Sequence, residues 1–121
     1  SQPRPERSPA SSRNLQRFRR FRDAVENGFR TTHQVGAYAG RLGCSQRSLA
    51  RAARESAGTS AKAFLAQRIA LEAKRLLAHT IHPIKAIADE LGFDEPTNFV
   101  KFFRREAGCS PGDFRRRNSG R

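Results

Sequence analysis

The sequence predicts an all-helical protein in which two helix-turn-helix subdomains are joined by a long linker helix. Apolar residues recur three and four positions apart through most of the chain, the spacing that places side chains on one buried helix face. A helix, a glycine turn and a second helix occur twice, on either side of an uninterrupted helical stretch. We therefore expect one domain at residues 15–117, divided into subdomain one (15–60), the linker helix (61–79) and subdomain two (80–117).

The N-terminal segment, residues 1–14, is predicted to be a flexible linker or tail. It holds three of the six prolines and almost no apolar side chain, so it cannot bury enough surface to become ordered. A supporting helix begins near Leu15 and ends near Gly28. Because the chain starts with Ser1 rather than methionine, we expect the natural polypeptide to be longer.

The first helix-turn-helix unit extends from Val35 to Gly58. Its first helix is predicted to end at Gly43, and Ser45 is predicted to cap the second helix, at about residues 45–57. The outward face of that second helix is rich in arginine. It carries Gln46, Arg47, Ala50, Arg51 and Arg54.

The linker helix at residues 61–79 has the longest uninterrupted helical pattern, with a buried seam of leucine, isoleucine and alanine. At ~1.5 Å per residue it spans somewhat under 30 Å. Two helices that enter successive major grooves on one side of B-DNA lie about 34 Å apart. The length of the linker helix is compatible with that spacing.

The second unit repeats the pattern between Pro83 and Gly108. Gly92 ends its first helix, and Asp94 is predicted to cap the second, at about residues 95–107. This second helix buries three phenylalanines and exposes small polar groups followed by cations. The exposed residues are Thr97, Asn98, Lys101, Arg104 and Arg105. Ser110 is predicted to cap a closing helix that starts with Pro111, and residues 118–121 are predicted to form a basic tail.

The two units match each other along their length. Leu42-Gly43-Cys44-Ser45 corresponds to Leu91-Gly92-Phe93-Asp94, and Gly58 corresponds to Gly108, with one additional residue near the turn of the second unit. A polar helix face is usually just a solvated face. Its repetition in tandem on a basic chain indicates a nucleic-acid-binding protein instead.

Charge restricts the partners further. Lysine and arginine number 24 against 11 acidic residues, which gives a formal net charge of +13 at pH 7. This imbalance favours a polyanion, either nucleic acid or an anionic membrane surface. No apolar run approaches the ~20 residues of a membrane span, so we expect an intracellular protein that does not use a membrane.

No grouping of residues indicates catalysis, a metal or a cofactor. Cys44 and Cys109 lie far apart in the sequence, without the spacing of a zinc site, and are expected to be reduced thiols. His79 and His82 are three residues apart, but Pro83 follows directly, so we expect His82 to lie outside the helix and the two side chains not to form a metal site. We find no nucleophile beside a base and no phosphate-binding glycine loop, and we expect a protein that is not an enzyme.

The segment AIADELGFDEPTNFVKFFRREAGCSPGDFR, at Ala86–Arg115, resembles the DNA-binding domain of the AraC/XylS family of bacterial transcription regulators. The resemblance covers roughly Arg17 to Arg117. It implies a seven-helix domain that reads DNA in two parts. Ala52-Ala53 stands where that family usually has bulky apolar residues, and Ala61 stands where it often has proline, so we expect the first unit to be packed differently or held less firmly.

By position, the resemblance implies two sets of base-reading residues. They are Gln46, Arg47, Ala50 and Arg51 in the first unit, and Pro96, Thr97, Asn98 and Lys101 in the second. Arg54, Arg104 and Arg105 are our candidates for contacts with DNA phosphates, because of their places on the helix faces.

The expected function is sequence-specific binding of double-stranded DNA and regulation of transcription, with activation the implied outcome. Expected partners are double-stranded DNA, RNA polymerase, and an N-terminal effector or dimerisation domain. The expected location is the cytoplasm, in association with the nucleoid. The alternative is a non-specific or architectural basic DNA-binding protein. Neutralising ~8 phosphates makes the affinity of either kind steeply salt-dependent, so salt dependence alone does not separate them.

Overall fold

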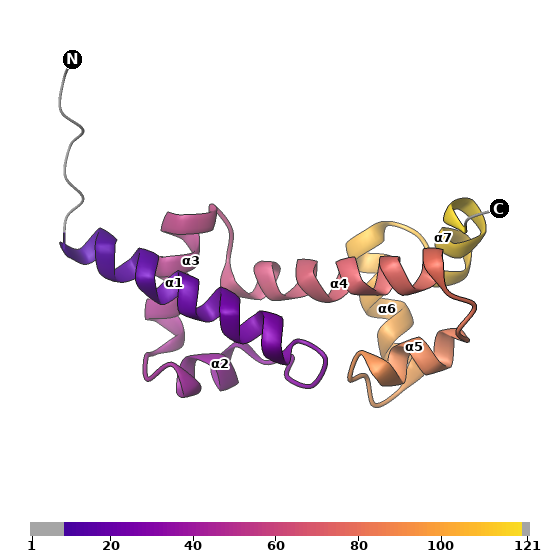
Figure 1. The fold of residues 1–121 in the computed structure, drawn as a ribbon, viewed down its shortest axis with the longest axis horizontal. Coiled ribbons are helices and arrows are strands. Elements are labelled where there is room, and N and C mark those ends of the chain that lie inside the picture. The colour runs from indigo at the N-terminus through magenta and orange to yellow at the C-terminus, as the bar shows by residue number, and fades with distance from the viewer. Residues whose placement is uncertain (1–8, 120–121) are drawn as a thin grey trace, which may run out of the picture. The chain divides into compact units, whose positions relative to one another are not determined.

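The computed structural model describes residues 9–119, and in that range it contains seven helices and no strand (Figure 1). The predicted all-helical class is confirmed. The helices are α1 (Pro9–Gly28), α2 (Val35–Arg41), α3 (Gln46–Ala57), α4 (Ala61–His79), α5 (Ile84–Glu90), α6 (Pro96–Ala107) and α7 (Pro111–Asn118).

Helix α1 begins at Pro9 rather than near Leu15, so the predicted tail is wrong for its last residues. Within the added turns, the buried side chain of Asn14 donates from Nδ2 to the carboxylate of Glu55 on α3, at 2.7 Å. A polar contact therefore stabilises the first turns of α1, and the spacing of apolar residues, from which the helix start was predicted, does not reveal such a contact. The rest of the predicted tail, residues 1–8, and the last two residues of the basic tail lie outside the described residues.

Serine side chains cap three of the described helices. Ser45 Oγ accepts from the backbone N–H of Ser48 at the start of α3, at 3.0 Å. Ser110 Oγ accepts from Asp113 N–H at the start of α7, at 3.1 Å, and Ser60 does the same for α4. The predicted caps at Ser45 and Ser110 are confirmed.

Helix α6 starts differently, and the predicted cap at Asp94 is wrong. The residue before the first helical position is Glu95, which has extended backbone angles and makes no side-chain capping bond. Pro96 occupies the first helical position. Because proline has no backbone N–H, this helix start has one donor fewer to satisfy.

The turns that follow α2 and α5 have the same backbone structure. Gly43 (φ 68°) and Gly92 (φ 84°) both adopt the left-handed conformation. The N–H of the next residue donates back to the helix in each case, from Cys44 to Ala39 O at 3.0 Å and from Phe93 to Ala88 O at 2.9 Å. This is the Schellman arrangement, which glycine adopts without steric cost. The repeat predicted from sequence is therefore present in the backbone.

The chain divides into two units, which we describe separately. Unit 1 contains residues up to Asn27 together with Gln34–Phe64, and unit 2 contains Gly28–His33 together with the chain from Leu65 onward. The short Gly28–His33 loop thus belongs to unit 2, although it lies in the sequence between two helices of unit 1.

The core of unit 1 is built from aromatic side chains around a helix of small residues. Ala52 and Ala53 on α3 are fully buried. The bulk comes from other helices: the Phe21 ring lies 5.7 Å from both Tyr38 on α2 and Phe64 on α4. The small side chains of α3 are therefore matched by large ones on its neighbours.

The core of unit 2 is a continuous cluster of phenylalanines. Phe93 follows the turn after α5, and its ring lies 5.4 Å from Phe99 and 5.3 Å from Phe102 on α6. Phe103 continues the cluster to Phe114 on α7, at 5.5 Å. Burying rings of this size supplies most of the hydrophobic free energy available to a small unit, and it orients α6 with its phenylalanines inward.

The Gly28–His33 loop packs against the turn between α5 and α6. The His33 ring lies 4.9 Å from the ring of Phe93. The backbone carbonyl of Arg30 faces Gly92 so closely that a Cβ atom there would collide with it. Gly92 is therefore required both for its backbone conformation and for this close approach.

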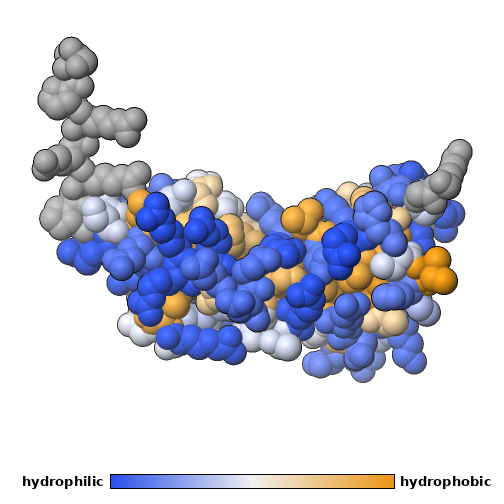
Figure 2. Space-filling model, in the orientation of Figure 1, coloured by the Kyte–Doolittle hydropathy of each residue, from blue (hydrophilic) through white to orange (hydrophobic). Residues whose placement is uncertain are grey.

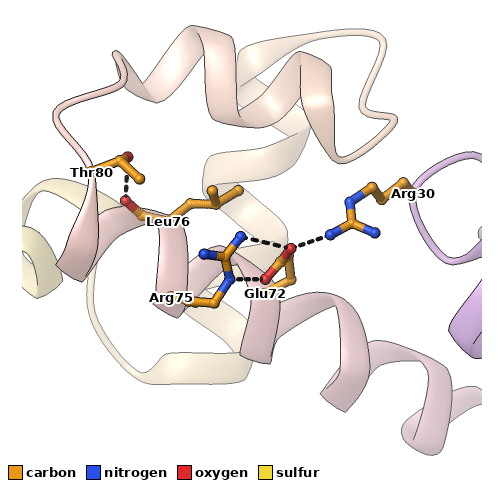
Figure 3. A network of polar contacts seen from close by, with 5 residues as sticks. All are labelled: Arg30, Glu72, Arg75, Leu76 and Thr80. Carbon is orange, nitrogen blue, oxygen red and sulfur yellow. Dashed lines mark hydrogen bonds and ion pairs between the residues drawn. The ribbon is translucent and has the colours of Figure 1, made fainter.

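A buried carboxylate joins the same loop to α4 (Figure 3). Glu72, only 4% exposed, accepts from Arg75 Nε at 2.5 Å and from the terminal nitrogen of Arg75 at 3.1 Å, and it also pairs with Arg30. The hydrogen bond from Arg75 is the main cause that lowers the pKa of Glu72, against the opposing effect of burial. The charged form of Glu72 is thus the form that the fold stabilises.

In the described part of the chain, no helix is both long enough and apolar enough to cross a membrane. Among residues 9–119 we also find no group of three or more histidine, cysteine, aspartate or glutamate side chains that could hold a metal ion.

Gly92→Ala should destabilise the protein more than Gly43→Ala. Both changes force alanine into a left-handed conformation, which costs about 1–2 kcal/mol. Only at Gly92 would the new Cβ also meet the carbonyl of Arg30, whereas nothing lies within 4 Å of the equivalent position at Gly43. Urea unfolding of both variants measures the difference. Equal losses would show that the loop does not constrain this turn.

Glu72→Gln should lower the free energy of unfolding by about 1–2 kcal/mol near pH 7, because Arg30 and Arg75 lose a charged partner but stay about half exposed to water. A lowered pKa stabilises the fold above the unfolded-state pKa, and this stabilisation is lost as the pH falls through the folded-state pKa. The gap between wild type and variant should therefore close on acidification. A gap that is constant from about pH 7 to about pH 3 would contradict this role.

Candidate nucleic-acid interface

Helix α3 separates a buried face from a cationic one. Leu49, Ala52 and Ala53 are fully buried. The predicted site residues lie on the other side: Gln46, Arg47, Arg51 and Arg54 are exposed, and Ala50 is half-buried. The sequence folds this way because the buried positions recur every three or four residues, which leaves the arginines on the outside.

Gln46 lies at the first helical position of α3 and close to α2. A Cβ atom on Gly36 would come within 2.7 Å of its Nε2 atom, so the amide lies over the first turn of α2. Glycine at that position leaves room for the amide. The side chain of Gln46 is therefore positioned by a neighbouring helix, in contrast to the arginines that follow it.

Helix α6 presents a second face with a different composition. Phe99 and Phe103 are fully buried. The exposed residues are Thr97, Asn98, Lys101, Arg104 and Arg105, while Pro96 is half-buried. Amide and hydroxyl groups therefore occupy the start of the helix, and two arginines occupy its last turn.

The cations on these faces have few partners within the chain. Among residues 9–119, the side chains of Arg47, Arg51, Arg54, Lys101 and Arg104 make no ion pair or hydrogen bond. Arg105 is the exception, with its guanidinium 6.0 Å from the ring of Phe102 and Nε 3.9 Å from Glu106. Exposed cations without intramolecular partners are available to an anion outside the chain.

One face of the described chain is largely hydrophilic. On the face seen in Figure 2, blue hydrophilic side chains cover most of the described chain and only small orange areas of apolar side chains lie between them. The predicted site residues fall into two groups, one on α3 and one on α6. Each group lies on one exposed face of a single helix.

The residues that pack against the turn before α6 were not identified from the sequence. The Gly28–His33 loop and Glu72 set the position of the turn before this helix, and neither belongs to a helix-turn-helix repeat. A loop has no periodicity to reveal its neighbours. The one available signal was Glu72 itself, an acidic residue among the apolar residues of the linker helix.

A helix-turn-helix domain family matches residues 38–117 of this chain, which contain part of α2 and all of α3 to α7. The chain belongs to the AraC-type helix-turn-helix family. The matched residues contain the pairs α2 with α3 and α5 with α6, and in each pair a left-handed glycine follows the first helix.

Curated relatives of this AraC-type chain include the HTH-type transcriptional activator RhaR from Klebsiella pneumoniae, 37% identical over 76 residues, and RhaR from Yersinia pseudotuberculosis, 39% identical over 72 residues. These matches cover 63% and 60% of this chain but only 27% and 25% of the relatives. The matched region thus spans about a quarter of the length of these activators.

Solved structures have the same fold. The C-terminal domain of AraT, a response regulator from Geobacillus stearothermophilus, has a TM-score of 0.75 and 26% identity, covering 94% of this chain and 89% of that one. The DNA-binding domain of AdpA, solved with a target DNA, has a TM-score of 0.68 and 25% identity, covering 91% and 93%. An AraC-type regulator from Chromobacterium violaceum, at 20% identity, has a TM-score of 0.74 over 88% and 96% of the chains.

Proposed function

We propose that this chain binds double-stranded DNA sequence-specifically and regulates transcription, with α3 and α6 as its recognition helices. The observation that carries the proposal is the pair of exposed helix faces, each following a left-handed glycine turn in an AraC-type domain. The relatives that are transcriptional activators and the AdpA domain that binds its target DNA support it.

The base-reading residues that we propose are neutral polar groups and arginines near the helix starts. Asn98 can bind adenine through two hydrogen bonds, and arginine can do the same with guanine. Ala50 offers only an apolar contact, for example with a thymine methyl group. The full set is Gln46, Arg47, Ala50 and Arg51 on α3, and Pro96, Thr97, Asn98 and Lys101 on α6.

Arg54, Arg104 and Arg105 are proposed to contact phosphates. They lie towards the C-terminal ends of α3 and α6, beyond the residues proposed to read bases. Phosphate contacts of this kind orient a helix in the groove but carry no sequence information.

The proposed binding mode uses two successive major grooves. Helix α4 has 19 residues, about 28 Å at 1.5 Å per residue, which is comparable to the ~34 Å helical repeat of DNA. The proposed domain organisation has subdomains at residues 15–60 and 80–117, joined by α4.

Several wider features of the natural protein are part of the same proposal. The RhaR relatives are named as activators, and this chain matches only about a quarter of their length. We propose activation as the output, RNA polymerase as a partner, and an additional N-terminal domain for effector binding or dimerisation. We also propose a non-enzymatic protein located in the cytoplasm with the nucleoid.

The alternative is a basic protein that binds DNA without regard to sequence. Pure phosphate binding needs cations only. Exposed Thr97 and Asn98 at the start of α6, and the Gln46 amide positioned over α2, favour the sequence-specific function instead.

Selection from a random pool of duplexes should yield a preferred sequence in two parts. The affinity for that sequence, measured beside random DNA at one salt concentration, should be higher by about 10³ or more. A ratio within about tenfold would favour the non-specific alternative. A motif with a single part would contradict the use of both recognition helices.

Asn98→Ala should weaken binding to the selected sequence by about 1–3 kcal/mol and leave random-DNA binding nearly unchanged. Fluorescence anisotropy with both duplexes measures the two affinities. Asn27→Ala is the matched control, because Asn27 is an exposed asparagine on α1 that bonds only to the backbone of its own helix.

Arg104→Ala provides the opposite control, since loss of a phosphate contact should weaken binding to both duplexes alike and reduce the salt slope by about one. Equal losses on both duplexes for Asn98→Ala would show that Asn98 does not read a base.

A further inference from the structure

Unit 2 contains a groove that the proposed DNA-binding function does not use. It has a volume of about 790 Å³ and follows one face of α4, from Arg68 to His79, with the Gly28–His33 loop and α7 also contributing. None of its lining residues lies on α3 or α6. At 1.5 Å per residue this face is about 17 Å long, enough for about three turns of a bound helix.

The groove is positively charged. Arg30, Arg68, Lys74 and Arg75 line it, and Glu72 is the one carboxylate among its lining residues. Both oxygens of Glu72 already accept hydrogen bonds from Arg30 and Arg75. Four cationic side chains and one carboxylate thus line the groove, and that carboxylate is already engaged by two of the arginines.

The arginines of the groove are held in place before any ligand binds. Arg30 and Arg75 are fixed by Glu72 (Figure 3), and the guanidinium of Arg68 lies 4.2 Å from the ring of Phe29. A guanidinium has five N–H donors, so Arg75, which uses two of its nitrogens on Glu72, keeps donors for a further acceptor. Side chains that are already ordered lose less entropy on binding.

An apolar side chain stands within this charged surface. Leu71, which lines the groove, is 61% exposed, and it is one of two large apolar side chains found exposed in the described part of the chain. The ring of Phe114 also lines the groove. DNA phosphates make no use of an exposed leucine, whereas a protein segment can bury it.

From these features we infer that the groove along α4 binds an acidic protein segment that also carries an apolar side chain. Charge complementarity selects the acidic residues of the partner, and Leu71 with Phe114 receives its apolar residue. The concave shape fits a single helix or strand. A duplex is instead bound by protein elements that project into its grooves. The inference does not rest on the DNA-binding proposal.

The probe is a short fluorescein-labelled peptide of glutamate and leucine, with the leucines at helical spacing, titrated with the 121-residue chain near physiological salt. Leu71→Ser and Lys74→Glu should each weaken its binding about fivefold or more. A second peptide with serine in place of leucine should bind wild type less tightly and be insensitive to Leu71→Ser.

Lys85→Glu is the matched control, because Lys85 is an exposed lysine of unit 2 that lies outside the groove. It makes the same change in net charge as Lys74→Glu. Because only long-range attraction, which salt screens, is altered, the affinity for the peptide should change less than twofold. Thermal melting of each variant confirms that the fold is kept.

Three results would overturn the inference. One is a failure of the glutamate and leucine peptide to bind. Another is an equal loss from Lys85→Glu and Lys74→Glu, which would mean attraction to net charge alone. A third is a set of three observations made together: random duplex DNA displaces the peptide, Leu71→Ser leaves peptide binding unchanged, and Lys74→Glu weakens DNA binding. That pattern would assign the groove to nucleic acid.

Discussion

The exposed helices of this protein depend on the left-handed glycine turn that precedes each of them. At Gly43 and at Gly92 the chain leaves one helix, returns two backbone hydrogen bonds to it and starts the next helix within a few residues. So short a connection leaves the second helix little freedom to rotate about its axis. Which side chains of α3 and α6 face outward is therefore settled largely at the turn, and the buried residues of each helix then fix the orientation.

The two units satisfy this constraint with different cores. Helix α6 brings its own bulk, Phe99, Phe102 and Phe103, whereas the buried residues of α3 are Leu49, Ala52 and Ala53, and the aromatic rings of unit 1 come from α1, α2 and α4. The expectation that the first unit is packed differently agrees with this contrast. Because α3 is held by the side chains of its neighbours, its orientation depends on several elements, while α6 is oriented mainly by its own phenylalanines and by the turn at Phe93.

The sequence predicted the elements whose signal is local and missed those whose contacts are distant. Helical spacing, the glycine turns and the serine caps at Ser45 and Ser110 are local, and the structure has them. Asp94 was predicted as a cap because aspartate after the Gly92 turn can accept from the first N–H groups of the next helix, and it corresponds to Ser45 in the repeat. The additional residue of the second unit lies before α6, however, and moves the cap position to Glu95.

The early start of α1 and the Gly28–His33 contacts could not be predicted in the same way. Asn14 is paired with Glu55, and Arg30 with Glu72, across intervals of about forty residues. Neither pair produces a periodic apolar pattern, and both involve side chains that are usually solvated. The residues proposed to contact DNA were placed on exposed faces because that placement follows from helical periodicity alone, and their roles stay predictions.

Several cations of the chain are stabilised within the fold, either by a hydrogen-bonding partner or by the helix dipole. Arg30 and Arg75 are balanced by Glu72, and Arg115 donates to the carbonyls of Leu77 and Thr80 at the end of α4, so the fold itself accounts for these cations. Arg104, in the last turn of α6, is favoured by the negative end of the helix dipole.

Arg47 fits neither explanation. It lies in the first turn of α3, where the helix dipole disfavours a cation, that turn contains no acidic residue, and the described chain offers Arg47 no ion pair. Neither the helix dipole nor a neighbouring side chain therefore stabilises the charge of Arg47. The proposed contact of Arg47 with DNA at the start of α3 would account for its place in the sequence.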